Sequence, residues 1–163
     1  GGEPTDDLDE GGWADDDSNL TVDFGFIERL RLGNLVFEDL NADGDADAGE
    51  PGIADVSVQL WSVDGAGDPD SLLAIDITDA NGFYEFVGLE PGDYIVAISD
   101  GEQVTGNELH RLVSTSGNGI APDVDTNASD NDDNGEPATG FASITAPVTL
   151  VGGTEPTGET DED

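Results

Sequence analysis

The stretch from Asp39 to Glu50 reads D-L-N-A-D-G-D-A-D-A-G-E and restricts how the chain on either side of it can fold. Oxygen-bearing side chains alternate along it, a glycine is its sixth residue and a glutamate its twelfth. This is the spacing of a Ca²⁺-binding loop, in which the glycine permits a sharp turn and the glutamate supplies a bidentate carboxylate. The predicted ligands are Asp39, Asn41, Asp43, Asp45 through its carbonyl oxygen, Asp47 and Glu50. The alternative is a solvated acidic loop.

The residues on either side of this loop indicate strands rather than helices. Residues 32–37 lead directly into it, and Pro51-Gly52 follows Glu50. Because proline and glycine together do not continue a helix, the loop lacks the helix that follows the metal site in an EF-hand. The sequence therefore predicts a strand-flanked Ca²⁺ loop.

A second concentration of acidic residues lies between residues 123 and 136. It contains two runs of alternating oxygen donors, but neither run has a glutamate at the twelfth place. We interpret it as one or two looser sites completed by distant carboxylates, against the alternative of a solvated loop. This would bring the number of calcium ions above one. The candidate ligands here are Asp123, Asp125, Asn127, Asp130, Asp132 and Asn134.

Short apolar runs with a period of two occupy most of the remaining chain. Turn residues separate them, including an Asn81-Gly82 pair that favours a hairpin turn. Residues 107–114 alone suggest a helical turn or an irregular crossover. Strands at spacings of about ten residues are typical of an antiparallel sandwich. The strands are predicted at residues 20–25, 32–37, 56–61, 72–78, 83–87, 94–98 and 141–151.

The composition limits the classes of partner. The 163 residues carry 39 acidic side chains against three arginines and no lysine, for a formal net charge of −36. Nucleic acids and anionic membranes would repel this chain, whereas cations would be attracted. No apolar run is long enough for membrane insertion. Because the chain has no Cys, it cannot form disulfides, and metal ions are the cross-links available to stabilise it. The absence of Met leads us to expect a processed chain or a part of a longer one.

Catalysis finds little support in the residue types present. The chain has one histidine, His110, with no visible nucleophile partner, and it lacks the thiols and lysines of other covalent mechanisms. Carboxylate pairs are unavoidable among 39 acidic residues, but the metal-loop spacing accounts for the best-ordered ones. We therefore predict that the protein is not an enzyme.

Three segments together resemble a known family. They are G-N-L-V-F-E-D-L-N-A-D-G at residues 33–44, A-G-E-P-G-I-A-D-V-S-V-Q-L at 48–60 and N-G-F-Y-E-F-V-G-L-E-P-G-D-Y at 81–94. They are similar to the B-type repeats of serine-aspartate-repeat bacterial surface adhesins, in the collagen-adhesin B or prealbumin-like superfamily. The resemblance implies an all-β, antiparallel Greek-key sandwich, immunoglobulin-like or prealbumin-like, with strand-flanked Ca²⁺ loops. It also implies an extracellular location at a cell surface.

The order of the segments differs from that of the family. The closing strand of such repeats resembles N-L-T-V-D-F-G-F, which here lies at residues 19–26, ahead of the domain it would close. Residues 1–10 also resemble residues 153–162, as in a tandem array. We therefore expect an acidic linker at 1–18, a donated strand at 19–26, the calcium-binding domain at 27–151 and a second linker at 152–163.

The functional prediction combines these observations. We expect a calcium-stabilised structural module of a cell-surface fibre, with copies joined head to tail because strand 19–26 of one copy fills the open sheet edge of another. The alternative to strand donation is a monomeric bead whose strand folds back on its own sheet. The alternative function is an adhesive module that binds carbohydrate or another surface ligand. Asn19 and Asn127 also begin glycosylation sequons.

Overall fold

The computed structural model describes residues 24–27, 29–44, 46–114 and 134–153. These residues form strands and one short 3₁₀ helix, η1 (Asp100–Gln103). The strands are β1 (Leu30–Leu35), β2 (Ser57–Val63), β3 (Pro69–Ile77), β4 (Phe83–Leu89), β5 (Gly92–Ser99), β6 (Glu136–Ala138), β7 (Phe141–Ile144) and β8 (Val148–Leu150).

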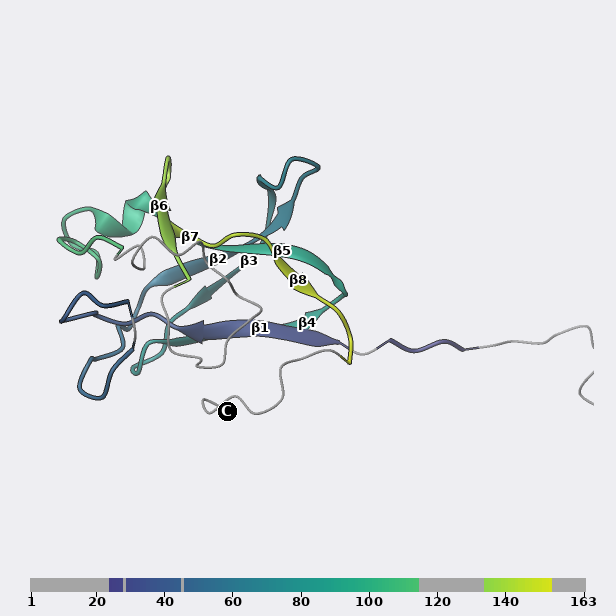
Figure 1. Cartoon of the computed structure of the whole chain (residues 1–163), viewed down its shortest axis with the longest axis horizontal. Helices are drawn as coiled ribbons and strands as arrows, with labels where there is room; N and C mark the ends of the chain where they lie inside the picture. The colour runs from purple at the N-terminus through teal and green to yellow at the C-terminus, as the bar shows by residue number, and fades with distance from the viewer. Residues whose placement is uncertain (1–23, 28, 45, 115–133, 154–163) are drawn as a thin grey trace, which may run out of the picture.

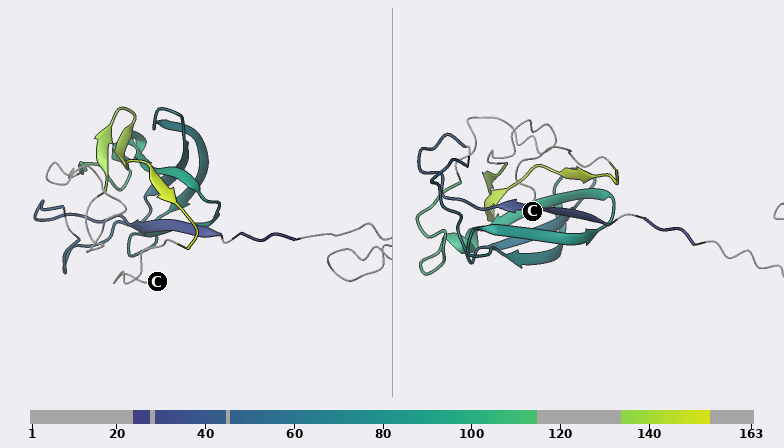
Figure 2. Two further views of the ribbon diagram at one scale, coloured as in Figure 1. Left: turned by 45° about the vertical axis from the view of Figure 1, so that its right-hand side comes forward. Right: turned by 90° about the horizontal axis from the view of Figure 1, so that it is seen from below.

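The strands form two antiparallel sheets that face each other (Figures 1 and 2). One sheet contains β1 and β4, and the other has the order β3-β2-β5-β7-β6, with β8 also paired to β5. The pairing of β1 with β4 and of β2 with β5 carries the chain back and forth between the two layers, as in Greek-key sandwiches. The predicted antiparallel β-sandwich is confirmed.

The interior lies between the two sheets and follows the predicted period of two. Val58 and Leu60 of β2 point into it, at 1% and 0% exposure, together with Phe86 of β4 and Val96 of β5. Burial of one such side chain contributes roughly 1.5–3 kcal/mol to the stability of the fold. Leu109, in the segment predicted as a helical turn or crossover, is 7% exposed and belongs to the same cluster.

Strand β5 lies in the middle of the larger sheet. The chain that pairs with β5 on the side away from β2 differs from the prediction for residues 141–151. Residues 141–151 were expected to form one strand, but they form β7 beside the second half of β5 and β8 beside the first. The pairing register shifts by one residue between them, and Thr145 bridges the shift through N–H and Oγ1 contacts to Val96. Pro147 lacks the N–H that a continuous ladder would need.

The outer face of the larger sheet carries an aromatic pair. Trp61 of β2 and Phe141 of β7 meet edge to face across β5, with ring centroids 6.0 Å apart. On that face of β5, Ile95 and Ala97 are each 1% exposed. Trp61 is half-buried, and its Nε1 donates to Gln59 Oε1 at 3.1 Å. The prediction that Trp61 packs within the fold agrees with this geometry.

Only the end of the proposed donated strand lies within the described residues. Phe24 and Phe26 belong to no strand and are 79% and 92% exposed. In Figure 1 the segment 24–27 leads away from the sandwich from the start of β1. Residues 19–23 lie outside the described part of the chain.

Candidate metal centre

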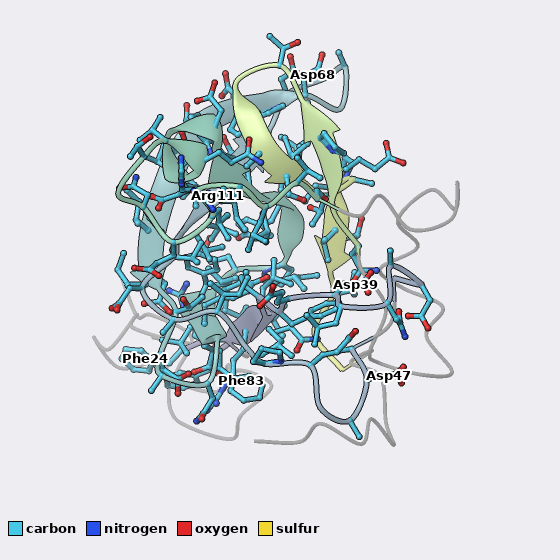
Figure 3. All side chains as sticks on the ribbon, turned by 90° about the vertical axis from the view of Figure 1, so that its left-hand side faces the viewer. Phe24, Asp39, Asp47, Asp68, Phe83 and Arg111 are labelled. Atoms are coloured by element: carbon cyan, nitrogen blue, oxygen red, sulfur yellow. The ribbon has the colours of Figure 1, made fainter. Side chains whose placement is uncertain are left out.

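The acidic loop 39–50 begins and ends on paired backbone. Phe37 and Gly52 form an antiparallel bridge, and Glu38 N–H donates to the Pro51 carbonyl at 2.9 Å. The loop projects from this base at one end of the sandwich, where Asp39 and Asp47 are labelled in Figure 3. Within the described residues no helix follows the loop, as its flanking residues predict: the bridge at Gly52 and a turn at residues 54–55 lead into β2.

The first and last residues of the loop both turn their carboxylates inward. Asp39 accepts bonds from Ala42 N–H at 2.6 Å and Gly44 N–H at 3.0 Å. Glu50 accepts from Leu40 N–H at 2.7 Å through Oε1 and from Asp47 N–H at 3.1 Å through Oε2. Both oxygens of each carboxylate are therefore held on the loop's inner side, where the template places metal ligands.

Asn41 occupies the space between two further carboxylates. Its Nδ2 donates to Asp43 Oδ2 at 2.8 Å and to Asp47 Oδ2 at 3.2 Å, while its Oδ1 accepts from Asp43 N–H at 2.9 Å. The amide N–H₂ is the positive end of the side-chain dipole, so it separates two like charges. A half-turn of this amide would present its oxygen instead.

The loop's backbone uses left-handed conformations at three residues. Gly44 and Gly49 have φ of 89° and 112°, and Ala42 has φ of 59°. Gly44 is the template glycine, and its positive φ explains why that position needs a residue without a Cβ.

The donor chemistry fits a hard divalent cation. Asp39, Asn41, Asp43, Asp47 and Glu50 offer only carboxylate and amide oxygens, the ligands that Ca²⁺ prefers. Asp45 lies outside the described residues. Among the residues that the structure describes, no group of three or more His, Cys, Asp or Glu side chains is gathered closely enough to hold a metal ion. The loop is ordered by hydrogen bonds that its own backbone N–H groups donate to the Asp39 and Glu50 carboxylates.

The base of the loop packs against a distant turn, which the sequence patterns did not indicate. Val36 N–H donates to the Gly82 carbonyl at 2.9 Å, and Ile53 N–H donates to the Val36 carbonyl at 2.7 Å. A Cβ added at Gly52 would lie 1.6 Å from the Asn81 carbonyl oxygen. The glycines in Pro51-Gly52 and Asn81-Gly82 therefore allow two turns to touch, in addition to ending strands.

A buried threonine ties the segment after the loop to the same region. Thr78 is 3% exposed, its Oγ1 donates to the Ile53 carbonyl at 2.7 Å and accepts from Val56 N–H at 2.9 Å. Its backbone N–H also donates to the Val56 carbonyl at 3.0 Å. A polar residue at the end of a predicted strand was the only signal for this contact.

The second acidic cluster lies almost entirely outside the described residues. Of its six candidate ligands, only Asn134 is described. This residue is half-buried, and its Nδ2 has no hydrogen-bond partner. The candidates at 123–132 remain predictions.

Three further features bear on other functional classes. The Trp61 ring contacts Phe141 edge to face, so the aromatic pair does not form an open platform. His110 Nε2 lies 3.1 Å from Thr105 Oγ1 on an exposed turn. The described residues contain no helix with the length and apolar character needed to cross a membrane.

Comparisons with known proteins identify relatives of part of the chain. A stretch of 89 residues, 53% of the chain, is 40% identical to serine-aspartate repeat-containing protein F of Staphylococcus epidermidis and covers 5% of that protein. Protein I of Staphylococcus saprophyticus is 42% identical over 89 residues, 53% of the chain and 4% of that protein. Colossin-B of Dictyostelium discoideum is 33% identical over 87 residues, 52% of the chain and 2% of that protein.

These matches cover a small part of much longer relatives. The family description that matches the chain, the SdrD B-like domain, covers residues 30–155. That range contains all the described strands and the acidic loop, and it bears out the resemblance carried by residues 33–44, 48–60 and 81–94. The chain belongs to the SdrD B-like domain family.

Proposed function

We propose that this chain is a calcium-stabilised structural repeat module of an extracellular, cell-surface fibre. The family and its relatives support the repeat-module part of this proposal, since three relatives are far longer than the matched stretch and two are named for their repeats. The same family membership and the residue types support a non-enzymatic role. The calcium-binding part of the proposal rests on the acidic loop at residues 39–50.

The main observation is the inward orientation of the Asp39 and Glu50 carboxylates around a loop closed at its base. Asp39, Asn41, Asp43, Asp47 and Glu50 would hold the ion, with Asp45 contributing its carbonyl oxygen. Bound Ca²⁺ would supply positive charge among carboxylates that otherwise repel each other. Because the base of the loop packs on the 79–82 turn, this stabilisation would reach the sandwich itself.

The calcium proposal is tested by thermal unfolding with Ca²⁺ and with a chelator. A site of about 10 μM affinity at about 1 mM free Ca²⁺ would add roughly 2.7 kcal/mol to the free energy of unfolding. We expect a clear rise in melting temperature with Ca²⁺, and further ions in the 123–134 cluster would enlarge it. Equal melting temperatures in the two conditions would contradict a structural role for the metal.

The strand-donation part of the proposal is supported by the N-terminal segment and by the free edge of β1. Phe24, Phe26 and Ile27 are exposed on a segment that leads away from the sandwich, rather than folding back on it (Figure 1). Among the described residues, β1 pairs with β4 on one side only. A two-stranded sheet is marginal by itself, so a third strand would add stability.

The hydrogen-bonding pattern indicates which backbone groups of β1 would receive that strand. Glu85 N–H, opposite Gly33, donates to Asp76 Oδ2 at 2.9 Å and so points away from β1. Residues opposite each other in an antiparallel ladder share this orientation, so Gly33 directs its N–H and C=O to the free edge. Arg31 and Leu35, two residues to either side, would share that direction.

Strand donation predicts concentration-dependent assembly of the chain into filaments. The test is electron microscopy and sedimentation of the full chain and of a Phe24→Asp variant, since Phe24 is exposed before assembly and its replacement spares the fold. The matched control is Val104→Asp, at a residue that is 56% exposed and lies outside the segment. We expect Phe24→Asp to abolish filaments and Val104→Asp to retain them. Filaments of equal length in both variants would exclude donation of this strand.

A further inference from the structure

Strand β3 is an edge strand of the larger sheet, on the side away from β8. Within the described residues it pairs only with β2, and at nine residues it is the longest strand (Figures 1 and 2). An edge strand presents unpaired N–H and C=O groups that can bind another extended chain.

The backbone orientation along β3 can be derived from its C-terminal end. Thr78 N–H donates to the Val56 carbonyl and Thr78 C=O accepts from Asp55 N–H, so Thr78 faces the β2 side. Main-chain groups alternate sides along a strand of an antiparallel pair. Ile77 and Ile75 are opposite Ser57 and Gln59 in the ladder, and their N–H and C=O groups therefore point to the free edge.

The side chains beside this edge are aliphatic and exposed. Ile75 and Ile77 lie on the outer face of the sheet at 54% and 51% exposure. Leu72 and Leu73, at the register shift opposite Trp61, extend this row of exposed aliphatic side chains, at 44% and 52% exposure. A long edge strand with exposed aliphatic side chains is unusual in an isolated domain, because it invites strand addition.

The charges around β3 select the partner. Asp68 and Asp70 lie at its start, Asp76 within it and Asp79 just after it. Arg29 and Arg31 are paired with Glu90 and Glu85 at 2.9 Å, on the other sheet. The chain has no lysine and only one further arginine, Arg111, so a second copy would bring no extended cationic segment to this edge. An acidic partner is therefore disfavoured and a basic one is attracted.

We propose that the free edge of β3 docks an extended, cationic segment of another protein by strand addition. Alternate aliphatic side chains of that segment would cover Ile75 and Ile77 on the outer face. The intervening Lys or Arg side chains would face the inner side of the sheet beside Asp76, whose Oδ2 also accepts from Glu85 N–H of β4 at 2.9 Å. The backbone groups of Ile75 and Ile77 would supply the ladder. This docking uses neither the acidic loop nor segment 19–26, so it is independent of the proposed function.

The test uses the full chain and a synthetic peptide of about ten residues that alternates Val and Lys. Because any cationic peptide is attracted to this chain, the key control has the same sequence and charge but is N-methylated at alternate residues, which removes the ladder donors. We expect the unmethylated peptide to bind at least about tenfold more tightly by fluorescence anisotropy, the effect of losing two or more hydrogen bonds. Equal affinities would overturn the proposal, since they would show unspecific charge attraction.

Two variants locate the binding site. Ile75→Pro removes the N–H that points to the free edge and leaves the ladder to β2 intact, a position where an edge strand tolerates proline. Ile75→Thr keeps the backbone and the β propensity but removes aliphatic area. Val87→Thr, at an exposed aliphatic residue of β4, is the matched control.

We expect Ile75→Pro to remove the preference for the unmethylated peptide, Ile75→Thr to weaken its binding while keeping the preference, and Val87→Thr to retain both, with thermal unfolding reporting on the fold of each variant. If Ile75→Pro keeps the preference and Ile75→Thr keeps the affinity, the site is not at β3. Self-association of the peptide-free chain that is lost in Ile75→Pro would also overturn the proposal, because a second copy would then occupy the edge.

Discussion

Two acidic turns of this molecule differ in how they satisfy their carboxylates. The turn that joins β2 to β3 has one organising residue, Asp64, whose Oδ1 accepts from Ala66 N–H at 2.8 Å and Asp68 N–H at 3.0 Å. The loop 39–50 instead has several carboxylates within twelve residues: backbone N–H groups donate to Asp39 and Glu50, the Asn41 amide donates to Asp43 and Asp47, and the loop base packs on the turn at 79–82. Backbone N–H groups suffice for the single charge of Asp64, whereas neighbouring like charges in one loop would also gain from a shared cation.

The largest expected difference between the two turns concerns the glycines beside them. Gly52→Ala would place a Cβ 1.6 Å from the Asn81 carbonyl oxygen, so the loop base and the 79–82 turn would have to separate. We expect a loss of roughly 3 kcal/mol in the free energy of unfolding, measured by chemical denaturation. Gly65→Ala, in the hairpin turn, meets nothing within 4 Å and should change it by less than about 0.5 kcal/mol. Equal losses would show that the loop base is not a rigid support.

The next largest effect is a difference between the two turns in how a charge-removing substitution changes the stability that Ca²⁺ adds. Glu50→Gln keeps the size of the side chain but removes the charge of the predicted bidentate ligand. We expect it to lose most of the roughly 2.7 kcal/mol that Ca²⁺ adds. In chelator we expect only a smaller loss, because Gln keeps one acceptor oxygen for Leu40 N–H but cannot also accept from Asp47 N–H. Asp64→Asn alters the net charge by the same amount in the hairpin turn and should keep the full calcium response. A calcium response that survives Glu50→Gln would place the ion elsewhere.

A smaller loss of stability is expected when the buried hydrogen bonds of Thr78, next to the base of the acidic loop, are removed. Thr78→Val keeps the shape of the side chain but leaves Val56 N–H and the Ile53 carbonyl without their buried partner. The expected loss is about 2 kcal/mol in the free energy of unfolding, with or without Ca²⁺. Thr149→Val removes an exposed hydroxyl that donates to Asp93 Oδ1 at 2.6 Å, and it serves as the control with a small effect. If Thr78→Val lowers the free energy of unfolding as little as Thr149→Val does, the hydrogen bonds from Thr78 to the segment after the loop do not connect the two rigidly.

The smallest effect belongs to the hairpin turn and depends on pH. Backbone N–H groups, that of Asp68 first and then that of Ala66, lower the pKa of Asp64 below its ordinary value of 3.8. Because the folded state favours the ionised form, Asp64 contributes stability above about pH 4, and this is lost as the pH falls through its folded pKa. We expect thermal unfolding of Asp64→Asn and of the unchanged chain to differ slightly at neutral pH and to converge in acid. A difference that grows in acid would contradict the sign of this shift.

Most of the fold was predictable because each strand carries its own signal. The period of two in β2 correctly predicted that Val58 and Leu60 are buried, and Asn81-Gly82 correctly predicted a turn, in which Gly82 has φ of 91°. In β5 the alternation did not predict burial, because Ile95, Val96 and Ala97 are buried in succession on both faces. The division of residues 141–151 into β7 and β8 was not predicted, because it depends on the register against β5. The three-residue strand β6 was also missed, since a run that short carries no period.

The ligand residues of the candidate metal loop were predictable from the sequence, but the contacts that hold the base of the loop on the sandwich were not. Its oxygen donors and Gly44 stand at template positions within twelve residues, so the amino-acid sequence alone determined the chemistry of this site and the all-β character of the chain around it. Only the tertiary structure decided that the base of the loop packs on the 79–82 turn, that β1 and β3 are edge strands among the described residues, and that Trp61 meets Phe141. The physical reason is distance along the chain: local spacing specifies turns and strand faces, whereas contacts between remote segments depend on how the two sheets pack.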